Sequence, residues 1–214
     1  MKRKITEKLV AWKNKSKSRM PLLVYGARQV GKTYIIRQFG AQQYKNIAEI
    51  NMETNKTVRE YFENNIEPER IIRFLETEVR ERIVPGETLI FFDEVQSCPR
   101  ALTAMKYFNE NTPEYHIVCA GSLLGVAINR EEFSFPVGNV DSLTMFPFDF
   151  EEFLWSQNEE MLCEEIKKSF GLYCQGRFFD RENLKQKKHP RRWLNPRGCV
   201  VFSYCFILPA PPIA

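Results

Sequence analysis

The sequence lacks several patterns that would assign it to a common class of protein. Its six cysteines form no C-x-x-C pair, and its only histidines are His116 and His189, so no zinc-ligand spacing is present. No apolar run approaches the roughly 18 residues of a membrane-spanning helix, and Met1-Lys2-Arg3-Lys4 leads into polar sequence rather than an apolar signal core. These absences predict a cytoplasmic protein with reduced thiols and without a membrane partner.

A net positive charge is lacking outside the end of the chain. Residues 175–214 hold 8 Lys and Arg against 2 Asp and Glu, which leaves 23 against 25 in residues 1–174 of a chain whose net charge is +4. Five of the 12 prolines also lie in residues 175–214. We therefore predict one domain over residues 1–174 and a basic, proline-rich tail over 175–214 that is not a domain and adds little to the fold. Because the main part is not basic, a nucleic-acid-binding module has only weak support.

Short apolar runs alternate with amphipathic stretches along residues 1–174, which predicts an α/β fold with a parallel sheet covered by helices. Strands are expected at residues 21–25, 47–51, 89–92, 116–121 and 140–146. Helices are expected at residues 5–17, 32–39, 58–64, 68–83, 99–111 and 123–129, and from about residue 149. A further apolar stretch at residues 200–208 has no neighbouring element left in the sequence with which to pair.

An octet between the first strand and its helix carries the clearest chemistry. Gly26-Ala27-Arg28-Gln29-Val30-Gly31-Lys32-Thr33 matches G-x-x-x-x-G-K-[ST] in the required strand-loop-helix context, so all eight residues are predicted to bind nucleotide phosphates. Glycines let backbone N–H groups approach phosphate oxygens, and Lys32 is suited to the β- and γ-phosphates. The Thr33 hydroxyl is suited to Mg²⁺. A chance glycine-rich turn is the alternative.

Two carboxylates follow the third predicted strand. Leu89-Ile90-Phe91-Phe92 runs into Asp93-Glu94, at the edge of a parallel sheet where ligands bind. Asp93 is predicted to join Thr33 in the Mg²⁺ site, and Glu94 is predicted to activate water as a general base. An ordinary acidic turn after a strand is the alternative, which the octet makes less favourable.

Ser122 follows the fourth predicted strand, where its hydroxyl could contact the γ-phosphate or orient the attacking water. Its alternative role is that of an N-cap for a helix beginning at Leu123. His116, at the start of that strand, is predicted to be a strand-end polar residue rather than a catalyst.

The sequence resembles the AAA+ ATPase superfamily, and in particular the prokaryotic predicted ATPases that carry an appended C-terminal domain of unknown function. The resemblance lies in the octet and in the segments at residues 90–108, 120–128 and 135–155. It implies a five-stranded P-loop NTPase sheet ordered 5-1-4-3-2 with helices on both faces, and it gives Ser122 the role of sensor 1. It also implies Mg²⁺-dependent ATP hydrolysis that remodels or switches an unknown protein partner, with a homo-oligomer left open.

Two departures from the family pattern bear on turnover. Asn139 stands where the family usually carries a basic residue, and Arg130 is a weak candidate for an arginine finger, because a solvated helix-end arginine is the more favoured interpretation. The helical lid and C-terminal domain have no match after residue 174, as expected of a truncated or frameshifted gene. The alternative function is therefore a truncated nucleotide-binding protein with little or no turnover. A P-loop kinase is less favoured, because Asp93-Glu94 is suited to activating water, which a kinase excludes.

Overall fold

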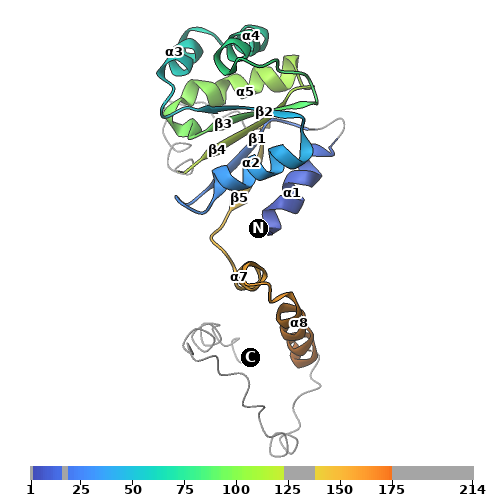
Figure 1. The fold of residues 1–214 in the computed structure, drawn as a ribbon. Helices are drawn as coiled ribbons and strands as arrows, with labels where there is room; N and C mark the ends of the chain where they lie inside the picture. Colours follow the sequence, from blue (N-terminus) through green and yellow to red (C-terminus); the bar gives the residue numbers. More distant parts are fainter. Residues whose placement is uncertain (1, 16–18, 123–137, 175–214) are drawn as a thin grey trace, which may run out of the picture. The chain divides into compact units, whose positions relative to one another are not determined.

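A five-stranded parallel sheet forms the centre of the computed structural model, which describes residues 2–15, 19–122 and 138–174 (Figure 1). The strands are β1 (Leu22–Gly26), β2 (Asn46–Asn51), β3 (Thr88–Asp93), β4 (His116–Gly121) and β5 (Asp141–Met145). The helices are α1 (Lys4–Lys13), α2 (Lys32–Gln43), α3 (Lys56–Asn64), α4 (Pro68–Val79), the 3₁₀ turn η1 (Val95–Ser97), α5 (Pro99–Asn111), α7 (Phe150–Ser156) and α8 (Glu160–Cys174).

The strand order is β2-β3-β4-β1-β5, and all neighbouring strands are parallel. Read from the other edge this is 5-1-4-3-2, so the predicted topology is confirmed. All carboxyl ends of the strands therefore meet at one edge of the sheet, where the loops after β1, β3 and β4 lie together.

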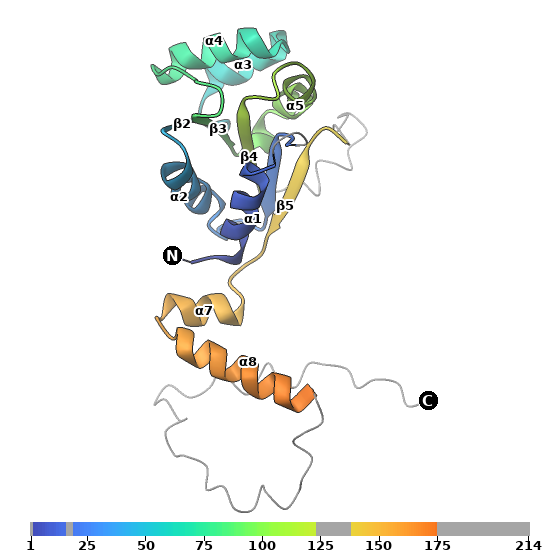
Figure 2. The same ribbon diagram turned by 90° about the vertical axis from the view of Figure 1, so that its right-hand side faces the viewer.

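Helices cover both faces of the sheet, as predicted (Figure 2). Side chains alternate along each strand, so Ile90 and Phe92 of β3 pack with the apolar sides of α3, α4 and α5. Leu89 and Phe91 face the opposite way and pack with α1 and α2. All of these strand side chains are fully buried. This two-sided burial explains why β3 is a continuous apolar run in the sequence.

Two compact units divide the chain, Met1–Cys163 and Glu164–Ala214. Among the described elements, the first contains the sheet, helices α1 to α5 and α7, and the start of α8. The described part of the second consists of residues 164–174, which belong to α8. The boundary predicted at residue 174 stays a prediction, because the tail at 175–214 and its apolar stretch at 200–208 lie outside the described residues. The helix predicted at 123–129 lies outside them as well.

Three predicted helix ends are wrong. Helix α1 ends at Lys13 instead of residue 17, and α2 continues to Gln43 instead of ending at residue 39. The pattern predicted a helix over residues 68–83, whereas α4 ends at Val79 and Arg80 adopts a left-handed conformation with φ 57°. The backbone N–H of Ile83 then donates to Glu76 Oε1 over 2.9 Å, and the Ile83 side chain is buried in the core beneath α4. The helix ends early because Ile83 gains more from packing into that core than from continuing on an exposed helical turn.

Candidate functional site

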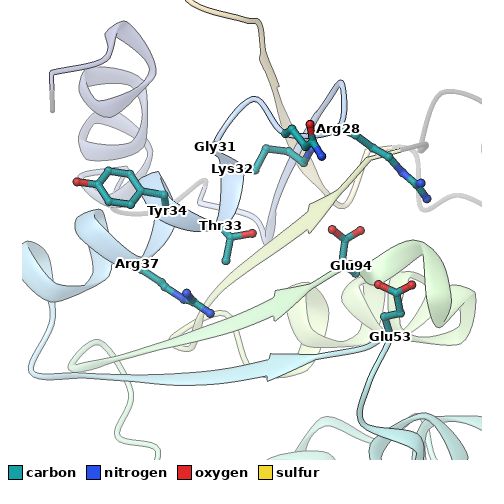
Figure 3. A pocket seen from close by; sticks show the side chains of 9 residues that line it. Arg28, Gly31, Lys32, Thr33, Tyr34, Arg37, Glu53 and Glu94 are labelled. Atoms are coloured by element: carbon teal, nitrogen blue, oxygen red, sulfur yellow. The ribbon is translucent and has the colours of Figure 1, made fainter. Parts of the chain in front are cut away.

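The octet forms the loop that joins β1 to α2 at the carboxyl edge of the sheet (Figure 3). Two glycines in it meet separate steric demands. A Cβ atom on Gly26 would lie 2.1 Å from the carbonyl oxygen of Met145 in β5, so the neighbouring strand excludes any side chain there. Gly31 has φ 90° and forms the N-cap of α2, a conformation that favours glycine.

Lys32 lies at the first turn of α2 and is only 7% exposed. Its Nζ donates to the carbonyl oxygens of Ala27 over 2.7 Å and Gly26 over 3.2 Å, within the same loop. Burial lowers the pKa of Lys32, while the nearby carboxylates of Glu94 and Asp93 act in the opposite direction. The loop therefore wraps around a mostly buried ammonium group, and such a group has a strong preference for an anionic partner.

Thr33 and Asp93, which are 60 positions apart in the sequence, meet directly. The Thr33 hydroxyl donates to Asp93 Oδ2 over 2.8 Å, and the backbone N–H of Glu94 donates to Asp93 Oδ1 over 3.0 Å. Asp93 is 5% exposed, and this burial raises the pKa of its carboxyl group. The hydrogen bond from Thr33 opposes that rise. A hydroxyl and a carboxylate are thus held together beside the loop.

Glu94 directly follows β3 and has a left-handed backbone, with φ 51°, at the start of η1. A non-glycine residue in this conformation is uncommon and is found disproportionately at functional sites. In Figure 3 the carboxylate of Glu94 points toward the loop that carries Lys32. The turn therefore directs this side chain toward the octet instead of leaving it on the outer surface.

Gln96 is a site residue for which the sequence analysis predicted no role. Its Nε2 donates to Glu94 Oε2, while its Oε1 accepts the backbone N–H of Ser122 over 3.2 Å. Nε2 also lies 3.4 Å from Ser122 Oγ. The feature of the sequence that could have indicated a role for Gln96 is its position three residues after Asp93, inside the family-like segment at residues 90–108.

A pocket of about 540 Å³ opens beside the octet. Its lining combines residues of the loop and of α2 with two carboxylates, and consists of Arg28, Gln29, Gly31, Lys32, Thr33, Tyr34, Arg37, Glu53 and Glu94. Its volume lies within the usual range for small-molecule sites. Tyr34, Arg37 and Glu53 were not predicted to belong here. Arg37 forms a bidentate ion pair with Glu49, with N···O distances of 2.6 and 2.8 Å, and this hydrogen-bonded pairing raises the pKa of Arg37.

The remaining predicted residues are placed as follows. Ala27 accepts the bond from Lys32, and the carbonyl oxygen of Val30 accepts a 3.3 Å hydrogen bond from Arg3. Asn139 Oδ1 accepts a hydrogen bond from Asn109 Nδ2 over 2.9 Å. Arg130 lies outside the described residues.

His116 begins β4, at the amino edge of the sheet and opposite the octet, as predicted. Its Nδ1 shares a 2.7 Å hydrogen bond with the Tyr44 hydroxyl, and the side chain is buried. Burial, helped by the positive charges of Arg19 and Lys13, lowers the pKa of His116 to about 4. This histidine is a neutral core residue.

Within the described ranges, no group of three or more His, Cys, Asp and Glu side chains could hold a metal ion. Thr33 and Asp93 nevertheless suit Mg²⁺, because this ion commonly takes one or two protein ligands and completes its shell with waters and substrate phosphates. In the same part of the chain no helix is both long enough and apolar enough to cross a membrane.

The family model described as "AAA domain" matches residues 18–154, more than half of the chain. No curated protein matches the sequence. Among solved structures, the chain is similar to C. elegans PCH-2, with 14% identity and a TM-score of 0.44, covering 76% of this chain and 47% of that one. It is also similar to the Aeropyrum pernix ORC1 protein in complex with DNA, with 16% identity, a TM-score of 0.44 and coverage of 72% and 48%. The chain thus spans about half the length of each.

Proposed function

This chain belongs to the AAA domain family of P-loop ATPases, and we propose that it binds Mg²⁺ and ATP through Gly26–Thr33 and Asp93 and hydrolyses the nucleotide with Glu94 as general base. The single observation that carries the proposal is the 2.8 Å contact between Thr33 Oγ1 and Asp93 Oδ2 beside the buried Lys32. Thr33 comes from the octet and Asp93 from the end of β3, and both were predicted to hold Mg²⁺. The two side chains meet at the carboxyl edge of the sheet.

The phosphate site uses Lys32 and the loop around it. The ammonium group now donates to carbonyl oxygens of its own loop, which are weaker partners than phosphate oxygens would be. Binding of the β- and γ-phosphates would therefore replace neutral acceptors with charged ones at little structural cost. This exchange supports Lys32 as the main cation for the phosphates.

The metal would be held by the Thr33 hydroxyl and the Asp93 carboxylate. When bound there, Mg²⁺ supplies charge neutralisation for the phosphoryl group being transferred. The second Asp93 oxygen keeps its hydrogen bond from the Glu94 backbone, which fixes the carboxylate plane relative to the loop. The main-chain bond thus ties the metal-binding residue to its catalytic neighbour.

Glu94 is in position to take a proton from an attacking water. It lines the pocket together with Lys32 and Thr33, and its carboxylate faces the loop (Figure 3). Ser122, on the neighbouring strand end, would then contact the γ-phosphate or the water, as its predicted sensor role requires. Hydrolysis would drive remodelling or switching of an unidentified protein partner. Assembly of the chain into a homo-oligomer is compatible with this function.

The alternative is a nucleotide-binding protein with little turnover. It is favoured by Asn139, a neutral residue whose amide oxygen is engaged by Asn109 where the family pattern usually has a cation. Binding without hydrolysis would select this alternative. Loss of ATP binding would remove both.

The test uses the wild-type protein and Glu94→Gln. Calorimetry should show Mg²⁺-dependent ATP binding in both, with dissociation constants within about twofold, because the amide keeps the shape of the side chain. Single-turnover hydrolysis should fall by about 10²–10⁴-fold in Glu94→Gln, the usual contribution of a general base.

Glu87→Gln is the matched control, since Glu87 lies at the amino edge of the sheet in an exposed pair with Lys45. Its binding and hydrolysis should equal those of the wild type. Hydrolysis that persists undiminished in Glu94→Gln would remove Glu94 from the mechanism.

A further inference from the structure

Gln96 joins the ends of two neighbouring strands through one side chain. It lies in η1, directly after β3, whereas Ser122 directly follows β4. Each end of its amide group has a partner: Nε2 donates to the Glu94 carboxylate and Oε1 accepts the Ser122 backbone N–H. The side chain therefore spans the distance between the predicted general base and the predicted sensor.

The orientation of this amide is determined by its partners. An ionised carboxylate can only accept hydrogen bonds, so the NH₂ end of Gln96 must face Glu94. A backbone N–H can only donate, so the carbonyl end must face Ser122. Reversing the amide would place acceptor against acceptor and donor against donor. Glutamine thus satisfies both ends, whereas a carboxylate or an apolar side chain at this position would not.

The turn that carries Gln96 is itself anchored. Val95 is fully buried in the core, and the backbone N–H of Ser97 donates to the Glu94 carbonyl oxygen over 3.0 Å. Glu94 provides the left-handed residue that begins this turn. A rigid turn brings Gln96 back toward the residue two positions before it, so that the amide restrains a side chain which would otherwise rotate freely into the pocket.

We propose that Gln96 is a positioning residue for ATP hydrolysis, holding the Glu94 carboxylate in place while being anchored on the backbone of Ser122. The proposal rests on the proposed function, since it assigns a role in the same reaction. Gln96 acts on the water only through Glu94. Its loss should therefore lower the rate of the chemical step and leave ATP binding almost unchanged.

Two variants separate the two ends of the amide. Gln96→Met keeps the length of the side chain and removes both hydrogen bonds. Gln96→Glu keeps an acceptor for the Ser122 N–H but has no donor for Glu94 when ionised. Gln42→Met is the matched control, because Gln42 is exposed near the end of α2. Thermal unfolding of every variant reports whether the fold is retained.

The measurements are ATP affinity by calorimetry and single-turnover hydrolysis at saturating ATP. We expect dissociation constants within about twofold of the wild type and hydrolysis about 10- to 100-fold slower in both Gln96 variants, the scale of a misplaced catalytic group. The Gln42 variant should match the wild type. Should Gln96→Met fail to fold, Gln96→Glu alone decides.

Wild-type hydrolysis in Gln96→Glu would overturn the proposal, because an acceptor for Ser122 would then suffice. A loss of affinity or of thermal stability without a slower chemical step would also overturn it, since it would indicate a purely structural role. If Glu94→Gln abolishes hydrolysis while both Gln96 variants remain fully active, only this inference fails. If the wild type neither binds nor hydrolyses ATP, the proposed function fails and this inference fails with it.

Discussion

At the scale of single residues, the site depends on side chains that are buried but charged. Lys32 in the loop and Asp93 at the end of β3 are both little exposed. Burial favours the neutral form of each side chain, so it lowers the pKa of Lys32 and raises the pKa of Asp93. The nearby carboxylates of Glu94 and Asp93 oppose the shift at Lys32, and the hydrogen bond from Thr33 opposes the shift at Asp93. Charges held in this way are stabilised further by a ligand of complementary charge, which is a property suited to binding Mg²⁺ and phosphates together.

Lys32→Ala should weaken ATP binding by about 1.5–3 kcal/mol, the usual scale for hydrogen bonds to a charged group. This corresponds to roughly a 10- to 150-fold rise in the dissociation constant measured by calorimetry. Lys45→Ala is the control, because Lys45 is exposed and lies before β2 at the opposite edge of the sheet. Equal affinities of Lys32→Ala and the wild type would argue against a phosphate-binding octet.

At the scale of elements, the N-terminal segment ties the octet to the chain that follows β5. Arg3 donates to the carbonyl oxygens of Val30 and Phe146, and its Nε lies 3.2 Å from Glu152 Oε1. Glu152 also accepts the backbone N–H of Lys4 and completes a capping box with Asp149 at the start of α7. The Arg3 side chain thus contacts the octet and the segment after β5, and its buried ion pair connects it to α7.

Arg3→Met should lower the free energy of unfolding by about 3 kcal/mol, because it leaves the buried Glu152 carboxylate without its charge partner. Urea denaturation followed by circular dichroism measures the change. Lys2→Met is the control, since Lys2 pairs with Glu160 at a well-exposed site, and it should change stability by no more than about 0.5 kcal/mol. A change of similar size in both variants would show that the Arg3 ion pair has no special role.

At the scale of the whole domain, the two edges of the sheet differ in chemistry. The carboxyl edge gathers polar and charged groups around the octet. The amino edge instead holds an aromatic cluster in which His116 makes edge-to-face contacts with Trp12 and Tyr44. This aromatic cluster lies at the edge of the sheet opposite the octet, so its contribution to stability can be tested separately from the site.

Because burial lowers the pKa of His116 to about 4, the folded protein binds fewer protons than the unfolded chain between that value and about 6.5. The contribution of His116 to stability is therefore complete above pH 6.5 and is lost as the pH falls toward 4, by at most about 3 kcal/mol. Denaturation of the wild type and of His116→Asn from pH 4 to 7 measures it. The wild-type curve should fall more steeply with decreasing pH than that of the variant, and parallel curves would contradict the prediction.

The sequence by itself determined the order of strands and helices, the octet and the carboxylates after β3. These features follow from local rules: hydrophobic periodicity, the steric freedom of glycine, and the fact that parallel strands present their carboxyl ends at one edge. The strand boundaries at His116–Gly121 and the helix at Pro99–Asn111 agree with the structure residue for residue. The spacing of apolar and turn residues was sufficient to predict these two elements, because the residues that define each element lie close together in the chain.

Only the tertiary structure decided which side chains meet across elements. The link from Gln96 to Ser122 and the bridge from Arg3 to Glu152 each join residues that are distant along the chain. The early end of α4 has the same origin, since Ile83 is drawn into a core formed by other elements. Packing and buried hydrogen bonds depend on partners that local periodicity does not specify, so these contacts could be identified only once the chain was folded.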